Sequence, residues 1–491
     1  MKNLSKFLIA VVVIVCCCET ACNKQEDPFM RYSGDNSSLN QLALKSGAVF
    51  TVSPGGDLKD SKAIQKAFDD AVAAGHGSTV QLTKGTFCLD ERIEVEGFVG
   101  WFKGAGKDKT IITTPPDEQV DFSLPVADWE SLIKFRHGNI NVSDFTIKIS
   151  NPYPCTGLAP DFWGEEDALP SVIMFTGNSV KEGATINPVV SFTLYNVKFI
   201  GKNNPDEFGD HYNVSYCVFI NIDGFLLEDW HDLNGSCKIT NCEFKNLFCD
   251  IWFTYDGICE IGGEKKSSGN KFEDANQGIY FCDCSNSIYN ISNNNFTKIN
   301  WDAVIVDQGE WGNPITISNF LIRNNYMEQD GSGAGIWLLD ASISKGEGKK
   351  MNVKISDNEI FLIDDMDDAA IWSCWAKDVL VTNNKIWGNG YAGICTSKEG
   401  EWEVGDEMSG WIIKYNNVQQ FDALVAPIWL KPTSHDNTVI GGSLNTTVLD
   451  EGTNNILINV NKKHRDHPPQ EIKKDMMRDH GMMKSLKGHR R

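Results

Sequence analysis

The chain has 491 residues, of which 41% are hydrophobic, so it can bury a large core. Its formal net charge of −21 at pH 7 argues against nucleic acid or an acidic membrane surface as the partner of the folded body. The same charge does not identify a substrate, because acidic loops also serve solubility.

The N-terminal segment, residues 1–22, has the pattern of a secretory signal. Lysines stand at the start of an apolar run over residues 7–15 that is too short to span a bilayer, and small residues lead to Cys22. This Thr-Ala-Cys ending resembles the lipobox of Bacteroidetes lipoproteins, which implies that Cys22 is lipidated and begins the mature protein. Glu19 stands where that pattern has leucine, so cleavage without lipidation is the alternative.

Residues 23–46 are expected to be a polar tether that holds the domain near the membrane. Acidic residues just behind Cys22 resemble the tag that sends such lipoproteins to the cell surface. The expected location is therefore the outer membrane, facing outward and attached through a lipid anchor. The periplasm is the alternative.

Residues 47–113 predict the N-terminal cap of a solenoid. A short strand is followed by Asp60-Ser61 and then by a helix whose apolar side chains fall on one stripe, and Gly75 ends this helix. The stripe consists of Ile64, Ala67, Phe68, Ala71 and Val72. A short capping helix at this place would cover the open end of the core, as terminal repeats must.

From residue 286 to residue 430 the sequence repeats two short phrases. The first reads Ile or Val, any residue, then Asn, Asp or Tyr, then Asn, and ends two positions later in a large apolar residue. Its fourth-position asparagines, with one upstream half-phrase, are residues 270, 294, 325, 358, 384 and 416. The second phrase is a small residue followed by apolar residues, as in Gly335-Ile-Trp337-Leu.

Repeats of short alternating strands at a variable period indicate a solenoid. No helical pattern separates the strands, which excludes a layered sheet of βαβ units. The prediction is an all-β chain in which residues 47–461 form a single-stranded right-handed parallel β-helix. Its coils would stack about 4.8 Å apart, and the asparagines would form a ladder inside a buried turn.

Three N-terminal motifs, together with the repeats, carry a family resemblance. They are Asp60-Ser-x-Ala-Ile-Gln-x-Ala-Phe-Asp-Asp, Gly85-Thr-Phe and Lys103-Gly-Ala-Gly. Over roughly residues 48–460 the chain resembles the pectin-lyase-like superfamily, in particular its pectate-lyase and polygalacturonase-like secreted proteins. The resemblance implies the β-helix fold. It says less about chemistry, because lyases, hydrolases, epimerases and tail-spike adhesins share this fold.

Stacking the second phrase in register predicts a column of outward-facing residues on one sheet. The column consists of Trp252, Tyr280, Ile305, Trp337, Trp372, Cys395 and Trp429. Exposed apolar surface of this size normally has a partner, and aromatic faces stack on the apolar faces of sugar rings. The five aromatic members are therefore predicted to bind an extended polysaccharide. The alternative is that loops cover the column and make it a secondary core.

Carboxylates follow the same strands at Asp283, Asp307 and Asp340. Adjacent coils would place Asp283 and Asp307 about 5–10 Å apart. Carboxylate pairs at such separations divide general acid and general base work on a glycosidic bond, and close like charges keep a proton on the acid. These three residues are the predicted catalytic group. The plain alternative is ordinary aspartate in the turns at strand ends.

The same carboxylates would hold Ca²⁺ if the protein were a lyase, in which a basic residue takes the C5 proton of a metal-neutralised uronate. Lys398 and Lys431, at the end of the same sheet, are the candidates for that basic residue and for substrate binding. The polygalacturonase motifs do not occur in order, and the Gly-His-Gly at His76 lies in the cap. Hydrolysis, which requires no cofactor here, is favoured because carboxylates outnumber basic residues on this face.

Residues 462–491 are rich in lysine and arginine, lack apolar periodicity and are expected to form a flexible basic tail. The whole chain is thus expected to be a monomeric, lipid-anchored surface protein that binds a polysaccharide and cleaves it. The rival from another class is a non-catalytic glycan-binding or adhesin-like surface lipoprotein.

Overall fold

The fold is seen in a computed structural model of the chain. The structure describes residues 47–115, 131–149, 171–176, 190–201, 218–223, 235–247, 249–254, 257–282, 288–307, 319–329, 333–339, 352–363, 369–374, 376–397, 408–432, 434–441 and 446–463. One compact unit begins at Ala48 and contains every described strand. No helix within these ranges is long and apolar enough to cross a membrane.

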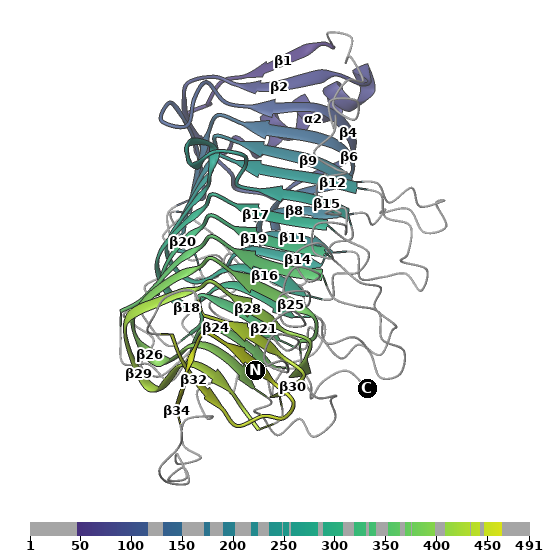
Figure 1. Cartoon of the computed structure of the whole chain (residues 1–491). Coiled ribbons are helices and arrows are strands. Elements are labelled where there is room, and N and C mark those ends of the chain that lie inside the picture. The colour runs from purple at the N-terminus through teal and green to yellow at the C-terminus, as the bar shows by residue number, and fades with distance from the viewer. Residues whose placement is uncertain are drawn as a thin grey trace, which may run out of the picture. The chain divides into compact units, whose positions relative to one another are not determined.

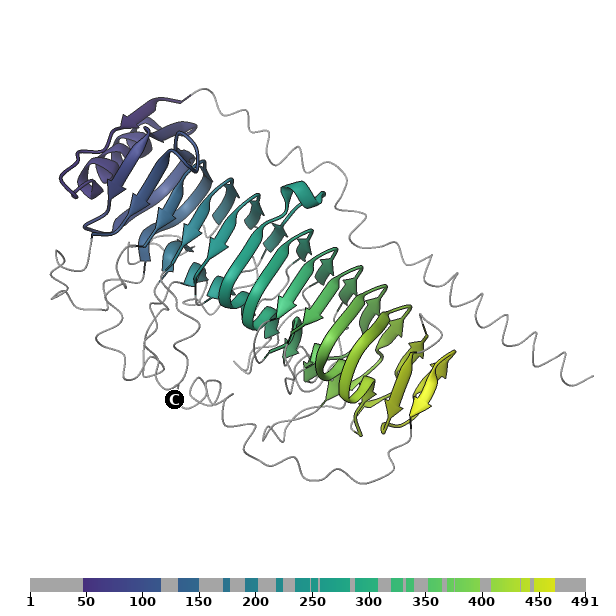
Figure 2. The same ribbon diagram turned by 90° about the vertical axis from the view of Figure 1, so that its left-hand side faces the viewer.

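Each coil of this unit is built from up to three strands, and strands at the same place in successive coils pair in parallel (Figures 1 and 2). The strands therefore form three stacks, A, B and C, which the chain visits in that order. Because several strands bend round a corner from one stack into the next, 32 strands join into one sheet. The fold is a right-handed parallel β-helix, as predicted.

Stack A contains β1 (Val49–Val52), β2 (Ser78–Leu82), the second halves of β4 (Ile93–Lys103) and β6 (Ser131–Ser143), β9 (Val190–Tyr195), β12 (Gly235–Thr240), β15 (Gly257–Ile261), β17 (Ile288–Ser292), β19 (Asn319–Arg323), β22 (Asn352–Ser356), β25 (Val379–Thr382), β28 (Ile412–Lys414), β31 (Thr438–Ile440) and β33 (Ile456–Ile458).

Stack B contains β3 (Gly85–Cys88), β5 (Thr110–Thr113), β7 (Thr146–Lys148), β10 (Lys198–Ile200), β13 (Glu243–Lys245), β20 (Tyr326–Gln329), β23 (Glu359–Leu362) and the first halves of β16 (Lys271–Cys282), β18 (Asn295–Asp307), β26 (Lys385–Ser397) and β29 (Asn417–Leu430). Stack C contains the first halves of β4 and β6, β8 (Ser171–Thr176), β11 (Val218–Asp223), β14 (Cys249–Thr254), the second halves of β16, β18, β26 and β29, β21 (Ile336–Leu339), β24 (Ala369–Cys374), β32 (Thr447–Asp450) and β34 (Asn461–Lys463). Outside the stacks lie the short pair β27 (Met408–Ser409) and β30 (Ser434–His435) and the 3₁₀ turn η7 (Lys266–Ser268).

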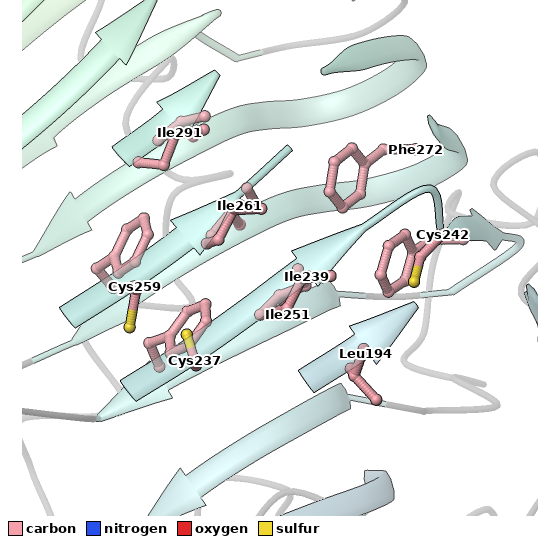
Figure 3. Close-up of a cluster of buried hydrophobic side chains, with 14 of the residues drawn as sticks. Leu194, Cys237, Ile239, Cys242, Ile251, Cys259, Ile261, Phe272 and Ile291 are labelled. Atoms are coloured by element: carbon pink, nitrogen blue, oxygen red, sulfur yellow. The ribbon is translucent and has the colours of Figure 1, made fainter. Parts of the chain in front are cut away.

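The core fills the inside of the solenoid with identical or similar side chains placed one above another. In stack A, Ile239 pairs with Ile261 and Ile261 with Ile291, and Figure 3 shows these side chains together in the interior. In stack B the rings of Phe244 and Phe272 stack 4.7 Å apart. Because each coil repeats the apolar pattern of the last, burial continues along the axis without a separate core for each coil.

The asparagine ladder lies in the turn from stack A to stack B and is buried, as predicted. The Oδ1 of Asn358 accepts hydrogen bonds of 3.0 Å from the backbone N–H and from the side-chain amide of Asn325. Its Nδ2 donates to the carbonyl of Ile322 and to the Oδ1 of Asn384, each at 3.0 Å. The rungs are Asn270, Asn294, Asn325, Asn358, Asn384 and Asn416, and none is more than 2% exposed. The residue before a rung, such as Asp357 with φ of 58°, takes the left-handed conformation that Asp and Asn tolerate.

The cap helix α2 (Ser61–Ala74) covers the N-terminal end of the core. Ile64 and Phe68 are fully buried, and the Phe68 ring meets that of Phe98 edge to face at 5.3 Å. Val72, predicted as part of the apolar stripe, is 39% exposed, so the buried stripe ends one residue earlier at Ala71.

Asp60 precedes α2 but its side chain does not cap the helix. Its carboxylate instead accepts hydrogen bonds of 2.7 Å from the backbone N–H groups of Gly55 and Cys88. The residue therefore joins the loop before the helix to β3.

Candidate functional site

The connections between strands identify stack C as the part of the scaffold that varies. The turn from A to B is short and repeated, as at residues 293–294, 324–325 and 357–358. The connections that leave stack C differ from coil to coil, as at residues 255–256, 308–318 and 340–351. Functional residues concentrate where a rigid scaffold carries variable connections, so the outward face of stack C is the candidate site.

The predicted column is in register on the outward side of stack C. Its members pair in the order Trp252, Tyr280, Ile305, Trp337, Trp372, Cys395 and Trp429. The apolar strand neighbours of the members, such as Val304 and Val306 beside Ile305, belong to the interior core, and the polar neighbours Ser373 and Thr396 are buried as well. The column therefore points away from the core, as strand alternation requires.

Most of this column is nevertheless covered, so the expectation of a continuous exposed platform is wrong. Tyr280 is 3% exposed, Trp337 8% and Trp429 3%, whereas Trp252 and Trp372 keep partial exposure. Part of the cover comes from the outward residues themselves. A second apolar cluster outside the core contains Ala369, Ala392, Cys395, Ala426, Trp429 and Leu449, with Trp372, Tyr391 and Val425 packed on it.

The rings of the column also lie on one another. Trp337 and Trp372 stack with centres 5.4 Å apart and planes 11° apart, and Trp252 meets Tyr280 at 4.3 Å with a 46° tilt. Face-to-face stacking along the axis covers one face of each indole in the tryptophan pair. A sugar ring at this pair can then use a ring edge or the remaining face of Trp372, the more exposed partner.

Lys431 and Trp429, two of the predicted substrate-binding residues, come together near the C-terminal end of stack C. The Lys431 Nζ lies 4.5 Å from the centre of the Trp429 ring and 5.7 Å from that of Tyr391. Trp429 Nε1 donates to Glu451 at 2.8 Å. Lys431 is only 4% exposed, so this ammonium is a fixed cation, and a cation held over an aromatic face in a desolvated place is stabilised by the ring.

Sequence reasoning missed Tyr391 and Glu451 as partners in this cluster. Tyr391 precedes the repeated phrase of its coil, and Glu451 follows β32, where the phrase has ended. Neither Tyr391 nor Glu451 belongs to a repeat, and Glu451 lies 22 residues after Trp429 in the chain. No sequence pattern therefore pointed to these two partners.

The predicted catalytic aspartates are only partly within the described residues. Asp307 ends β18, and its backbone pairs with Cys282 in the coil before and with Leu339 in the coil after. Asp283, Asp340 and the predicted substrate residue Lys398 lie outside the described residues. Asp283 and Asp340 directly follow Cys282 and Leu339 in the chain, so each stands one position beyond the register partner of Asp307.

Two other carboxyls near this face have defined environments. Asp302, 6% exposed, accepts a hydrogen bond of 2.7 Å from the backbone N–H of Ala334 and so ties two coils together. At the N-terminal end of stack C, burial works to raise the pKa of Glu94, but the hydrogen bond and charge of Arg136 and the charges of Arg92 and Lys134 outweigh it and lower that pKa.

Asp250 in β14 is a carboxyl that the alternation pattern misplaces. It is fully buried, and within the described part of the chain neither of its side-chain oxygens has a hydrogen-bond partner. Gly278 occupies its register position in the next coil, where an added Cβ would lie 2.8 Å from the buried Phe296 ring, so this position faces the interior. Burial raises the pKa of Asp250 well above its ordinary value, and the acid is therefore neutral in the folded protein.

The three strand stacks and their parallel register define a right-handed parallel β-helix protein. No family model and no curated protein matches the chain.

Solved structures with a similar fold include the A-module of the mannuronan C-5 epimerase AlgE4 of Azotobacter vinelandii, at 14% identity and a TM-score of 0.35, over 83% of this chain and 94% of that one. The Dettilon tailspike protein is 11% identical, with a TM-score of 0.45, over 83% of this chain and 68% of that one. The catalytic domain of a GH87 alpha-1,3-glucanase in complex with nigerose is 13% identical, with a TM-score of 0.40, over 84% of this chain and 65% of that one. At such identities and TM-scores these likenesses do not bear on the activity of this chain.

Proposed function

We propose that the outward face of stack C binds an extended polysaccharide and that the protein cleaves it by hydrolysis. The observation that carries the proposal is that the in-register outward column keeps two partly exposed tryptophans, Trp252 and Trp372, on the stack with the most variable connections. Trp252 and Trp372 offer the partly exposed aromatic surface.

In the proposed mechanism Asp307 and one or both of Asp283 and Asp340 divide the work at the glycosidic bond. One carboxyl, kept protonated by the charge of its neighbour, gives its proton to the leaving oxygen. An ionised partner removes a proton from the attacking water, or attacks the sugar carbon itself before water releases it. Asp307 stands at the end of an aromatic-column strand, where a chain held along the stack would pass.

A lyase is the second candidate, and in it the Lys431 side chain would have to act as a neutral amine to take the C5 proton. Such chemistry would use Ca²⁺ to neutralise a uronate carboxylate. Among the described residues there is no group of three or more His, Cys, Asp or Glu side chains that could hold a metal. We therefore derive no step through Ca²⁺.

We also propose that the domain acts at the cell surface, attached through a lipid on Cys22 and the tether 23–46. The signal, the tether and the basic tail 462–491 are supported by their sequence patterns. Only the first residues of the tail, at the end of β34, fall within the described part of the chain.

The test is a screen of the purified protein against a panel of polysaccharides, with reducing-end and near-ultraviolet readouts that separate hydrolysis from elimination. Asp307→Asn is expected to abolish cleavage and keep binding, because it preserves shape and removes the charge. Asp357→Asn, an exposed position in the A-to-B turn, is the matched control and should cleave normally. Normal cleavage by Asp307→Asn would remove this residue from the mechanism. Binding without cleavage by the unaltered protein would favour the adhesin-like alternative.

A further inference from the structure

The outward face of stack B changes character along the solenoid. In its earlier coils this face carries ion pairs: Glu243 joins Lys107 and Lys198, and Lys245 joins Glu273. Such solvated pairs are the ordinary covering of an exposed sheet. Two coils beyond Glu273, partly exposed aromatic side chains appear on this face.

The aromatic side chains form a cluster of Tyr326, Phe361 and Trp387, here called the stack-B aromatic patch. Phe361 and Trp387 are register partners whose rings stack with centres 5.5 Å apart and planes 21° apart. Tyr326 stands two coils from Trp387, yet their ring centres are only 6.4 Å apart. Coils repeat at about 4.8 Å, so these two rings lean toward each other over the coil between them. The three rings therefore form one surface instead of separate ladder positions.

Polar groups border the patch. The Tyr326 hydroxyl donates to Glu328 at 3.0 Å, and Lys385 Nζ lies 4.4 Å from the centre of the Trp387 ring. Glu359, the register partner of both Tyr326 and Lys385, reaches the Lys385 ammonium only at 4.0 Å. At that distance the pair makes no hydrogen bond, and the Glu359 side chain is 46% exposed, so its carboxylate is open to a ligand from solvent.

We infer that the stack-B aromatic patch is a second carbohydrate-binding site, one that takes a neutral sugar ring of a glycan chain. The C–H groups of a pyranose carry partial positive charge and pack on the negative face of an aromatic ring, so a bound sugar would take the place that the exposed Lys385 ammonium holds over Trp387. The Glu328 and Glu359 carboxylates accept hydrogen bonds from sugar hydroxyls. With two carboxylates against one ammonium at its border, the patch disfavours a uronate or sulfated sugar.

This site is separate from the candidate catalytic face, because stacks B and C are different sides of the same coils. It rests on the proposed function only in that the ligand is a glycan. The patch would hold the enzyme on a polysaccharide while stack C acts on a chain, which adds avidity without adding chemistry.

The experiment is affinity electrophoresis of the whole protein in gels that contain a soluble neutral glucan, a xylan or polygalacturonate. Trp387→Ala is expected to weaken retardation by a neutral glycan by about fivefold to tenfold, the effect of losing one aromatic contact. Glu359→Gln, which keeps its shape, should also weaken it without changing the melting temperature. Tyr195→Ala, an aromatic on stack A that is 49% exposed, is the matched control and should migrate as the unaltered protein does.

Trp372→Ala on stack C separates this inference from the proposed function. Loss of neutral-glycan retardation with Trp387→Ala but not with Trp372→Ala supports a second site. Loss only with Trp372→Ala overturns the second site and leaves the stack C proposal standing. Retardation only by polygalacturonate, or Trp387-dependent binding of poly-lysine without glycan binding, overturns the neutral-sugar assignment. An unaltered protein that no glycan retards overturns both proposals.

Discussion

Replacing Asn358 with alanine tests the asparagine ladder at its best-connected rung. The change removes four hydrogen bonds of 3.0 Å made by the side chain: two accepted from Asn325, one donated to Ile322 and one donated to Asn384. The Asn325 amide and the Asn384 oxygen keep other partners. The Asn325 backbone N–H loses its acceptor, whereas the Ile322 carbonyl lies in a paired strand. A buried unsatisfied group costs about 1–3 kcal/mol, so the expected loss is about 1–3 kcal/mol.

The measurement is urea unfolding followed by the circular dichroism of the sheet, with the free energy taken from the midpoint and slope. Asn139→Ala is the control, because Asn139 is an exposed asparagine in β6. Its cost should stay within about 0.5 kcal/mol, as surface changes do. If Asn358→Ala lowered the free energy of unfolding no more than this control does, the hydrogen bonds of the ladder would add nothing to stability. The reasoning from orphaned backbone groups would then be refuted.

Three further predictions concern the anchor, the aromatic column and the buried acid. Cys22→Ser should move the protein from the membrane fraction to the soluble fraction, and unchanged partition would show that Cys22 is not the anchor. Trp337→Ala should cost about 3–5 kcal/mol of stability, because Trp337 is 8% exposed and stacked on a neighbour. An unchanged melting temperature would instead show that the Trp337 side chain is exposed to solvent. Asp250 has a raised folded-state pKa, so the unfolded chain loses this proton first and stability falls as pH rises above about 4, by up to about 1.4 kcal/mol per pH unit. Asp250→Asn should remove that part of the pH dependence of unfolding, and identical pH profiles for the two proteins would place the carboxyl in contact with water.

The repeat pattern was sufficient to predict the solenoid because every coil places the same chemistry at the same position. The residues on either side of Asn325 have equivalents on either side of Asn358. The spacing of the repeats therefore predicts both the ladder and the register of the stacked strands. The outward direction of Trp337 followed from alternation in the same way. Its burial did not, since burial depends on how neighbouring rings and connections pack over it.

Two kinds of residue could not be predicted at all. Alternation fails at the corner between stacks B and C, where consecutive residues such as Ala303 and Val304 both enter the core. Asp250 lies at that corner, and strict period-two alternation from Ile251 would place it on the surface instead of in the core. Glu451 and Tyr391 meet the predicted residues Trp429 and Lys431 only through tertiary packing, which no local pattern records.

The ladder also bears on how such a chain changes its length over evolution. Because the side-chain bonds of each rung reach only into the coils directly before and after it, loss of residues 325–357 would bring Asn294 and Asn358 together as equivalent partners. A duplication or deletion of one whole coil therefore leaves every remaining turn satisfied, whereas a partial one orphans backbone groups. Gene rearrangements that respect the coil would lengthen or shorten the outward face of stack C one strand at a time. The number of sugar units that the proposed site spans can thus be selected independently of the stability of the scaffold.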